Sequence, residues 1–318
     1  MIDSSPGKTR SALRAFLTDA RMFIILIAIV ALFSILSPYF LRIRNIYAIG
    51  LTISVIGIVC IGQSLVLLTG AFDLSVGSVA GFSGMMVAFI TKNYGYYGLA
   101  LIAGLGTGAL IGLLNGLLVQ KARINALITT LSMLTIFQGA TFLISNGFAI
   151  GVNNEAFRFL GTYRLAGVPM PIVLLLLLYV VFYLMLRFTV FGRYVYSIGG
   201  NPEAARLSGI NVDRVRILVF MLTGMLSAFA GILLASRLGA AQTDAGSQYP
   251  LNSIAACVLG GISIAGGEGV ILGALVGVAI IGVLQSGLIM IGMPSYYQWI
   301  ATGVVLIIAV YIDSRKRS

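Results

Sequence analysis

Long runs of apolar residues follow one another along this chain. Ten of them are predicted to form membrane helices, at about residues 22–38, 46–69, 74–91, 96–119, 126–145, 170–189, 217–236, 252–265, 270–291 and 296–312. About 20 such residues make a helix long enough to cross the roughly 30 Å hydrocarbon core of a bilayer. The runs lack the alternation of apolar and polar positions that marks the strands of an outer-membrane barrel. The pattern therefore predicts an all-α integral membrane protein with about ten transmembrane helices.

The third and especially the eighth of these segments are short. The third covers residues 74–91, and the eighth, residues 252–265, reaches only about 21 Å at 1.5 Å per residue. We expect the eighth segment to be broken or re-entrant, and the length of either segment leaves open whether it fully crosses the membrane.

The composition of the 318 residues agrees with a membrane protein. Hydrophobic residues make up 59% of the chain and charged residues 9%, with a mean hydropathy of +1.05; a soluble domain is about half apolar and about a quarter charged. The chain has no histidine, and its two cysteines, Cys60 and Cys257, lie inside apolar runs, where small hydrophobic residues are expected. This argues against a disulfide framework, a Cys/His metal site and a histidine proton relay.

The distribution of basic residues predicts the orientation. The net charge of +11 does not indicate a nucleic-acid partner, because cytoplasmic loops of membrane proteins collect Lys and Arg. With a cytoplasmic N-terminus and ten crossings, the inside holds 14 of the 20 basic residues: Lys8, Arg10, Arg14, Arg21, Lys121, Arg123, Arg187, Arg193, Arg206, Arg214, Arg216, Arg315, Lys316 and Arg317. The outside holds Arg42, Arg44, Lys92, Arg158, Arg164 and Arg237. We therefore expect residues 1–21 and 314–318 to be cytoplasmic and residues 22–313 to form one transmembrane domain.

The first run resembles a secretory signal, but no small-residue cleavage site follows it, so a retained helix is expected.

Glycines spaced four residues apart suggest an internal repeat. At an offset of 165 residues, Gly104, Gly108 and Gly112, which Gly116 follows, match Gly269, Gly273 and Gly277. The same offset aligns the second predicted segment with the seventh and the fifth with the tenth. Chance is the alternative, since the chain contains 39 glycines. We predict two five-helix halves, about residues 22–145 and 170–312, that cross the membrane in opposite senses, as in many transporters.

Two carboxylates lie close to predicted membrane segments, Asp73 in "TGAFDLSVGS" and Glu268 in "IAGGEGV". A carboxylate inside a membrane is by default a candidate functional group. Both lie at the ends of short segments, however, and this favours a structural role. We expect Asp73, Ser75 and Gly77 to form a turn in which Asp73 caps the third segment, and Glu268 to lie in a glycine-rich turn.

No enzyme site is predicted. The "GKT" at Gly7–Thr9 lacks the earlier glycine that a phosphate-binding loop requires, so we expect this chain to bind neither nucleotide nor another cofactor. The polar residues of the predicted spans are neutral amides and hydroxyls, which suit a path for a neutral, polyhydroxylated solute better than one for an ion. The candidates for lining that path are Gln63, Ser64, Asn115, Thr129, Asn252 and Gln285. Hydrogen bonding between helices is the alternative role for these side chains.

The segment 190–216 is polar although it lies between two apolar runs, and it contains the start of a short helix. Asn201 is a good N-cap and Pro202 a good first helical residue. Glu203 lies in the first turn, where a negative charge favours the helix dipole.

The end of this helix is also specified. Arg206 falls in the last turn, and Gly209 suits the C′ position, which needs a left-handed backbone. We predict a helix over residues 202–208, with Gly199 and Gly200 forming a turn before it. A helix this short is unstable alone in water, so it must dock on the membrane domain of this chain or on a cytoplasmic partner. The nearby arginines favour a partner.

Several motifs resemble one protein family. The sequence "EAARLSG" at Glu203–Gly209 is similar to the EAA motif of ATP-binding-cassette (ABC) importer permeases. The stretches "GRYVYSIGGNPEAA", "DLSVGS", "NGLLV" and "LGGISIAGG" resemble the ribose-type monosaccharide permeases, and the resemblance extends over about residues 22–313. It implies that Gly200, Asn201, Pro202, Glu203, Ala204, Ala205, Arg206, Leu207 and Gly209 form a coupling helix that docks on a cytoplasmic ATPase subunit.

The resemblance also implies the setting of the protein. It implies a multi-pass subunit of the bacterial inner membrane that pairs with a second copy of itself or a paralogous permease and uses ATP through its partner. A periplasmic sugar-binding protein would deliver the sugar, a pentose such as ribose, to loops 146–169 and 237–251. Two departures are visible: the Ile-Leu-Pro tail of the broader EAA motif is absent, and Ala71-Phe72 replaces the common Gly-Ile. The alternative function is an ion-coupled secondary transporter of a neutral polar solute, for which Asp73 would bind the ion.

Overall fold

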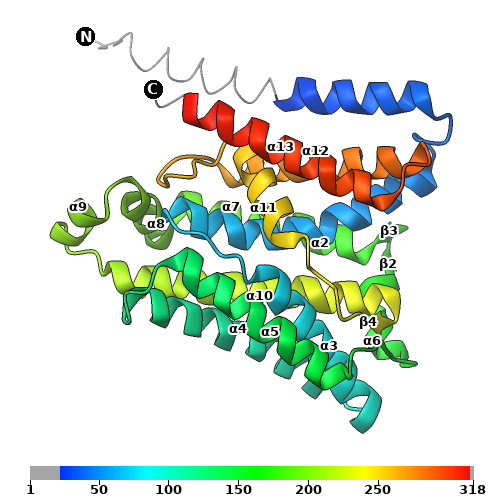
Figure 1. Cartoon of the computed structure of the whole chain (residues 1–318), viewed down its shortest axis with the longest axis horizontal. Helices are drawn as coiled ribbons and strands as arrows, with labels where there is room; N and C mark the ends of the chain where they lie inside the picture. The colour runs from blue at the N-terminus through cyan, green and yellow to red at the C-terminus, as the bar shows by residue number, and fades with distance from the viewer. Residues whose placement is uncertain (1–21, 316–318) are drawn as a thin grey trace.

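The computed structural model describes residues 22–315, which form a bundle of helices (Figure 1). After an N-terminal helix at Met22–Leu36, the first half contains α2 (Ile43–Leu68), α3 (Val76–Tyr94), α4 (Tyr97–Gln120) and α5 (Ala126–Ser145). The remaining helices are α6 (Glu155–Thr162), α7 (Met170–Phe188), α8 (Val190–Gly200), α9 (Pro202–Leu207), α10 (Val212–Leu238), α11 (Tyr249–Leu259), α12 (Ile271–Met290) and α13 (Ser295–Arg315). Two small antiparallel pairs join β1 (Ile150–Gly151) to β4 (Ala240–Ala241) and β2 (Arg164–Leu165) to β3 (Val168–Pro169).

The helices confirm the predicted class of an all-α membrane protein. Within the described residues, α2, α4, α5, α7, α10 and α12 are long and apolar enough to cross a membrane. Each of the ten predicted ranges overlaps a helix, but the number of crossings stays a prediction, because over their described residues the other four helices do not meet both criteria. The shortest of them, α11, has 11 residues, or about 16 Å of rise, and the chain turns away after Leu259.

The centre of the bundle is formed by α2 and α10. From Ser54 to Leu68 every residue of α2 is buried, and α10 packs against α2, α3 and α4. The glycines of α4 allow this close packing: a Cβ atom added at Gly112 would lie 2.2 Å from the carbonyl oxygen of Phe220 in α10. Small residues in such positions let helix backbones approach one another in a membrane.

The matched glycines of the second half are placed differently. Gly269 lies in the loop before α12, not inside the helix. Gly273 and Gly277 face α11, where Cβ atoms would lie 2.1 Å from the Gly260 oxygen and 2.0 Å from the Ala256 oxygen. The two glycine stripes therefore pack against helices that are not equivalent, and they do not by themselves support the predicted repeat.

The pairing of whole helices gives a better comparison of the two halves. Helix α3 packs against α4 and α5 of its own half and against α10 of the other half. Correspondingly, α11 packs against α12 and α13 of its own half and against α2 of the other half. Likewise α4 packs on α10 and α12 on α2. The first helices of the halves break this correspondence, because Phe33 of the N-terminal helix packs on Gly287 of α12, whereas α7 packs on α2. The inverted repeat remains a prediction.

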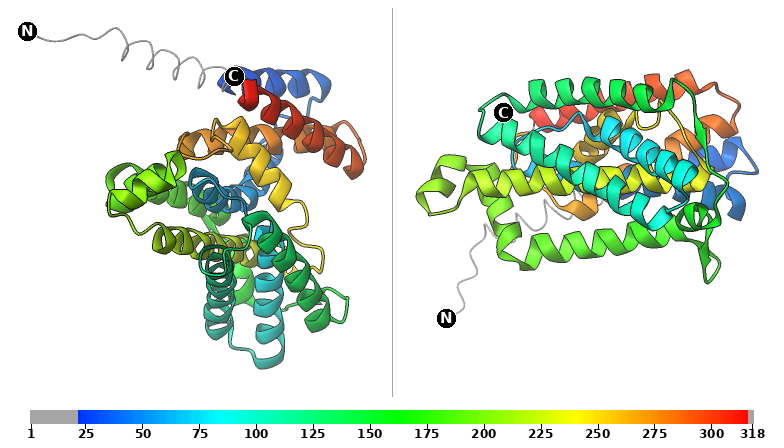
Figure 2. Two further views of the ribbon diagram at one scale, coloured as in Figure 1. Left: turned by 60° about the vertical axis from the view of Figure 1, so that its left-hand side comes forward. Right: turned by 90° about the horizontal axis from the view of Figure 1, so that it is seen from below.

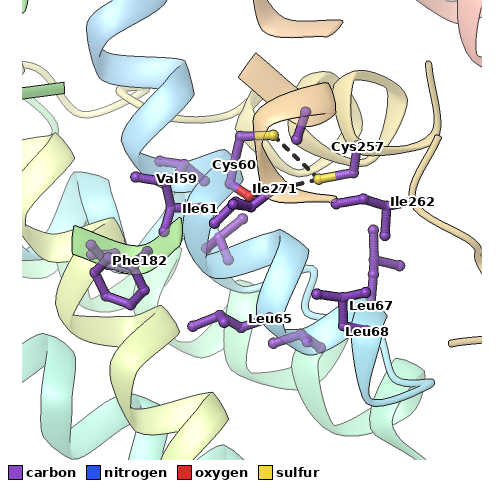
Figure 3. Packing of buried hydrophobic residues seen from close by; sticks show 14 of the residues in the cluster. Val59, Cys60, Ile61, Leu65, Leu67, Leu68, Phe182, Cys257, Ile262 and Ile271 are labelled. Carbon is purple, nitrogen blue, oxygen red and sulfur yellow. Dashed lines mark hydrogen bonds between the residues drawn. The ribbon is translucent and has the colours of Figure 1, made fainter. Parts of the chain in front are cut away.

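Both α3 and α11 begin inside the bundle, after loop segments that enter it (Figures 1 and 2). The start of α3 lies against the start of α11: a Cβ atom at Gly77 would lie 2.2 Å from the Gly246 oxygen and 3.0 Å from Pro250. Nearby, α11 packs against α2 through Cys60 and Cys257, whose Sγ atoms are 3.2 Å apart (Figure 3). Both cysteines are free and buried among apolar side chains, which confirms their predicted packing as small hydrophobic residues.

Candidate functional site

The start of α9 has the predicted chemistry. The side-chain oxygen of Asn201 accepts hydrogen bonds from the backbone N–H groups of Glu203 and Ala204, both at 3.0 Å. Pro202 occupies the first helical position and Glu203 lies in the first turn. The N-cap is thus confirmed, and it binds two of the N–H groups that every helix start leaves without a helical partner.

The end of α9 is closed by backbone hydrogen bonds around a left-handed glycine. The helix ends at Leu207, one residue earlier than predicted, and Gly209 has a φ of +83°. The Gly209 N–H donates to the Arg206 oxygen at 3.0 Å, and the Ile210 N–H donates to the Ala205 oxygen at 3.1 Å. This pair of bonds is a Schellman motif, and Gly209 holds the predicted C′ position.

The residues before α9 correct one prediction. Gly199 and Gly200, expected to form a turn, are the last two residues of an 11-residue helix, α8. A Cβ atom at Gly199 would lie 1.9 Å from the Leu68 oxygen and 2.3 Å from the Gly267 nitrogen, so this glycine permits close approach to the end of α2. The Tyr196 hydroxyl donates to the Gly269 oxygen at 2.9 Å, and burial raises the pKa of the Tyr196 phenol. These two contacts therefore hold α8, the helix that leads into α9, against the bundle.

Most of α9 itself is exposed at one end of the molecule (Figure 1). Ala205 is its one buried residue, whereas Leu207 is 89% exposed. The helix thus docks on its own chain through a single small side chain, and it leaves an apolar residue and charged side chains uncovered.

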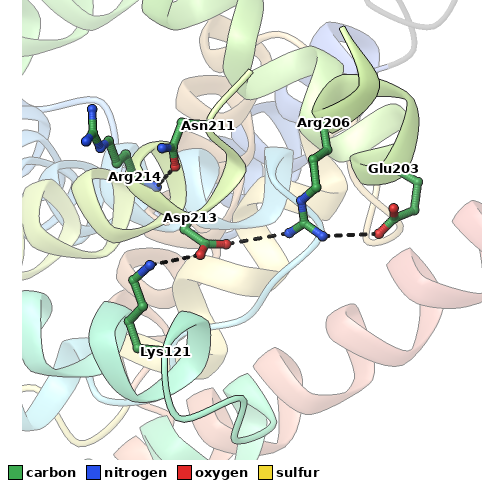
Figure 4. A network of polar contacts seen from close by, with 6 residues as sticks. All are labelled: Lys121, Glu203, Arg206, Asn211, Asp213 and Arg214. Carbon is green, nitrogen blue, oxygen red and sulfur yellow. Dashed lines mark hydrogen bonds and ion pairs between the residues drawn. The ribbon is translucent and has the colours of Figure 1, made fainter. Parts of the chain in front are cut away.

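Charged side chains link α9 to the neighbouring helix ends (Figure 4). Arg206 lies 3.5 Å from Glu203 and 3.6 Å from Asp213 at the start of α10. The same Asp213 accepts a hydrogen bond of 3.1 Å from Lys121, which follows α4. Such exposed pairs each contribute about 0–1 kcal/mol, so the network orients these elements more than it stabilises the fold.

A cavity of about 1100 Å³ lies beside this network. Its walls are the loop between α2 and α3, the loop between α4 and α5 and the segment from Arg206 to Arg216. No sequence signal indicates the cavity, because its three walls come from distant parts of the chain. Arg216, one of the arginines expected to favour a partner, is half-buried there and donates to the Thr69 oxygen at 3.0 Å.

The predicted turn at Asp73 is present with a different capping residue. The N-cap of α3 is Ser75, two residues after Asp73, because the helix begins at Val76. The buried Asp73 carboxylate accepts the Ser75 backbone N–H at 2.8 Å and the Ser75 hydroxyl at 2.6 Å. Asn115 of α4 donates to the same Ser75 oxygen at 2.8 Å. The other carboxylate, Glu268, is exposed in the loop before α12.

The six candidate path residues come from five helices, and none of them lines the cavity beside α9. Gln63, Ser64, Asn115, Thr129 and Asn252 are buried and Gln285 is half-buried. Ser64 donates to the Cys60 oxygen at 2.6 Å, as expected for a hydroxyl inside a helix. Among the described residues, both amide atoms of Gln63, the side-chain oxygens of Asn115 and Asn252 and the Thr129 hydroxyl are buried without a hydrogen-bond partner.

Comparison with known proteins extends the similarity over nearly the whole chain. The ribose import permease protein RbsC of Escherichia coli is 41% identical over 308 residues, which are 96% of each chain. RbsC of Bacillus subtilis is 42% identical over 296 residues, 92% of each chain. The L-arabinose ABC transporter permease protein AraH of Azospirillum brasilense is 37% identical over 314 residues, 99% of this chain and 93% of the relative. No solved structure matches.

These relatives confirm the resemblance to ribose-type permeases that the sequence motifs indicate. A family profile, described as the permease component of branched-chain amino acid transport systems, matches residues 45–310. The chain therefore belongs to this family of membrane transport permeases.

Proposed function

We propose that this chain is the permease subunit of an ABC importer that moves a monosaccharide, most simply a pentose such as ribose, across the bacterial inner membrane. The named functions of the relatives support the substrate class. In this proposal the chain binds no nucleotide or other cofactor, and a separate cytoplasmic ATPase subunit uses the ATP. A periplasmic sugar-binding protein and a second copy of the chain, or a paralogous permease, complete the transporter.

The observation that carries the proposal is the geometry of α9. A six-residue helix is too short to be stable by itself, yet this one is capped at both ends and leaves all but one of its residues uncovered. The Asn201 cap and the Gly209 turn define both ends of this helix, and the preceding helix α8 packs against the bundle. Such a helix suits the role of a coupling helix that fits a groove of the ATPase.

We propose that the α9 end faces the cytoplasm, with both termini on that side. Lys121, Arg123, Arg187, Arg193 and Arg206 belong to the segments at this end, as do Arg214 and Arg216. The positive-inside rule favours this orientation. The equivalent packing of α3 with α10 and of α11 with α2 supports two inverted halves.

We propose that the sugar path uses the neutral polar residues of the bundle. Sugar hydroxyls are donors and acceptors, so they match the unpartnered amide and hydroxyl atoms of Gln63, Asn115, Thr129 and Asn252. The ion-coupled alternative lacks such support, because the Asp73 carboxylate already accepts two hydrogen bonds from Ser75.

The test replaces Gly209 by Ala, which is strained at a φ of +83° although the surrounding space is open. The matched control is Gly95→Ala at the opposite end, where φ is +75° and the space is likewise open. We expect Gly209→Ala to reduce both sugar uptake and co-purification of the ATPase, with normal membrane insertion, and Gly95→Ala to preserve both. Uptake by the purified chain alone in vesicles under an ion gradient, without an ATPase, would refute the proposal.

A further inference from the structure

The cavity beside α9 is large, and most of its wall comes from segments other than α9. Its volume of about 1100 Å³ exceeds the roughly 300–1,000 Å³ of a typical small-ligand pocket. Its walls include Phe72 of the α2–α3 loop, Ile124 of the α4–α5 loop and Ile210 after α9. The space is sufficient for a turn of a second polypeptide.

The charges on the cavity wall are unbalanced. Three arginines, Arg123, Arg206 and Arg216, line it together with one carboxylate, Asp213. That carboxylate is already shared, since Lys121 lies 3.1 Å and Arg206 3.6 Å from its oxygens. Glu203 also lies 3.5 Å from Arg206, but Lys121 and the three arginines outnumber these two carboxylates, so the wall keeps a positive charge.

Arg216 is the arginine of this wall with a hydrogen-bond donor available for a negative group. One terminal nitrogen of its guanidinium donates to the Thr69 oxygen at 3.0 Å, which fixes the side chain in place. Its Nε atom is buried and has no hydrogen-bond partner among the described residues. A buried N–H without a partner is costly, and the Nε edge of a guanidinium is suited to bind a carboxylate through two hydrogen bonds.

We propose that this cavity receives an acidic segment of the ATPase subunit, with an Asp or Glu carboxylate bound at Arg216. This inference rests on the proposed function and adds to the coupling helix a second contact of different chemistry. The exposed Leu207 of α9 presents an apolar surface to the ATPase, while the cavity supplies the basic surface. Charge complementarity favours an acidic segment. The cavity also lies among loops and helix ends beside the projecting α9, which favours a protein over the headgroup of an anionic lipid.

The first test measures how tightly the purified ATPase subunit binds to the permease in phosphatidylcholine nanodiscs. Arg216→Gln should weaken binding by about tenfold or more, because it leaves a carboxylate without its partner. The matched control is Arg214→Gln, two residues away, which removes an exposed arginine that does not line the cavity and should change binding by less than about twofold. Arg216→Lys keeps the charge and can donate to Thr69, but it lacks the paired N–H groups of a guanidinium. It should therefore reduce the affinity for the ATPase by an intermediate amount.

The second test identifies the occupant directly. A photoreactive phenylalanine in place of Ile124, which is 41% exposed on the cavity wall, should cross-link in the assembled transporter to an acidic peptide of the ATPase. Cross-links to phospholipid alone would overturn the proposal, as would wild-type affinity in both Arg216 variants. If the wild-type permease binds no ATPase at all, the proposed function fails; if it binds but the Arg216 variants bind equally well, this inference alone fails.

Discussion

The stability of α9 depends strongly on its N-cap, Asn201. The Asn201 oxygen binds two backbone N–H groups, and replacing an Asn N-cap with Ala costs about 0.5–2 kcal/mol, typically about 1. Since α9 has six residues and one buried side chain, little else compensates for the loss. We expect Asn201→Ala to raise the fraction of molecules in which α9 is open by roughly 5- to 30-fold, the factor that corresponds to about 1–2 kcal/mol.

Hydrogen exchange in nanodiscs measures this opening. The backbone amides of residues 203–210 should exchange faster in Asn201→Ala, whereas those of α8 should be unchanged, because Gly199 and Tyr196 hold α8 against the bundle independently of the cap. Local opening of this kind sets exchange rates without global unfolding. Sugar uptake should fall together with the protection of α9, because in the proposed function α9 docks on the ATPase and must be folded to do so.

A matched control is the N-cap of α6 at the other end of the bundle. Asn154 accepts one bond, from the Phe157 N–H at 3.0 Å, so Asn154→Ala should loosen α6 and leave α9 protected. The reasoning is refuted if Asn201→Ala leaves the exchange of residues 203–210 at the wild-type rate. Equal loosening of α9 by both variants would also refute it.

Two further predictions concern the packing of the bundle. Gly112→Ala should destabilise the protein by about 1–3 kcal/mol, because its Cβ would lie 2.2 Å from the Phe220 oxygen. The control Gly106→Ala lies on the same helix with open space around it, so it should be neutral or slightly stabilising. Equal unfolding midpoints for the two variants would contradict the packing argument. Copper phenanthroline should join Cys60 to Cys257, whose sulfurs are 3.2 Å apart. The linked peptide should appear in a mass spectrum, and its absence would contradict the packing of α11 on α2.

The ends of α9 could be predicted from sequence because capping is local. Asn201 binds N–H groups two and three residues ahead, and Gly209 acts through its own φ, so neither depends on distant contacts. The glycine pair before α9 could not be predicted in this way. Gly199 packs against Leu68 and Gly267, which are remote in the sequence, and this contact continues α8 where the dipeptide alone suggests a turn.

The candidate path shows a similar limit. Hydropathy places Gln63, Thr129 and Asn252 inside membrane segments, and the structure confirms that all three are buried. Hydropathy does not show the direction in which each side chain points around its helix, so it could not show whether they share one cavity. For the same reason the sequence indicated a turn at Asp73 but not its contact through Ser75 with Asn115 of α4.

In the proposed function, the attachments of α9 determine how a movement driven by the ATPase would reach the membrane helices. Through α8, the backbone of Gly199 lies against the end of α2 and the loop before α12. Through Arg206, Asp213 and Lys121, α9 is linked to the start of α10 and the end of α4. The first contact is a close backbone contact, whereas the second consists of exposed ion pairs that are individually weak. We infer that α9 moves with α2 as one body, while its link to α4 can break and re-form during a transport cycle.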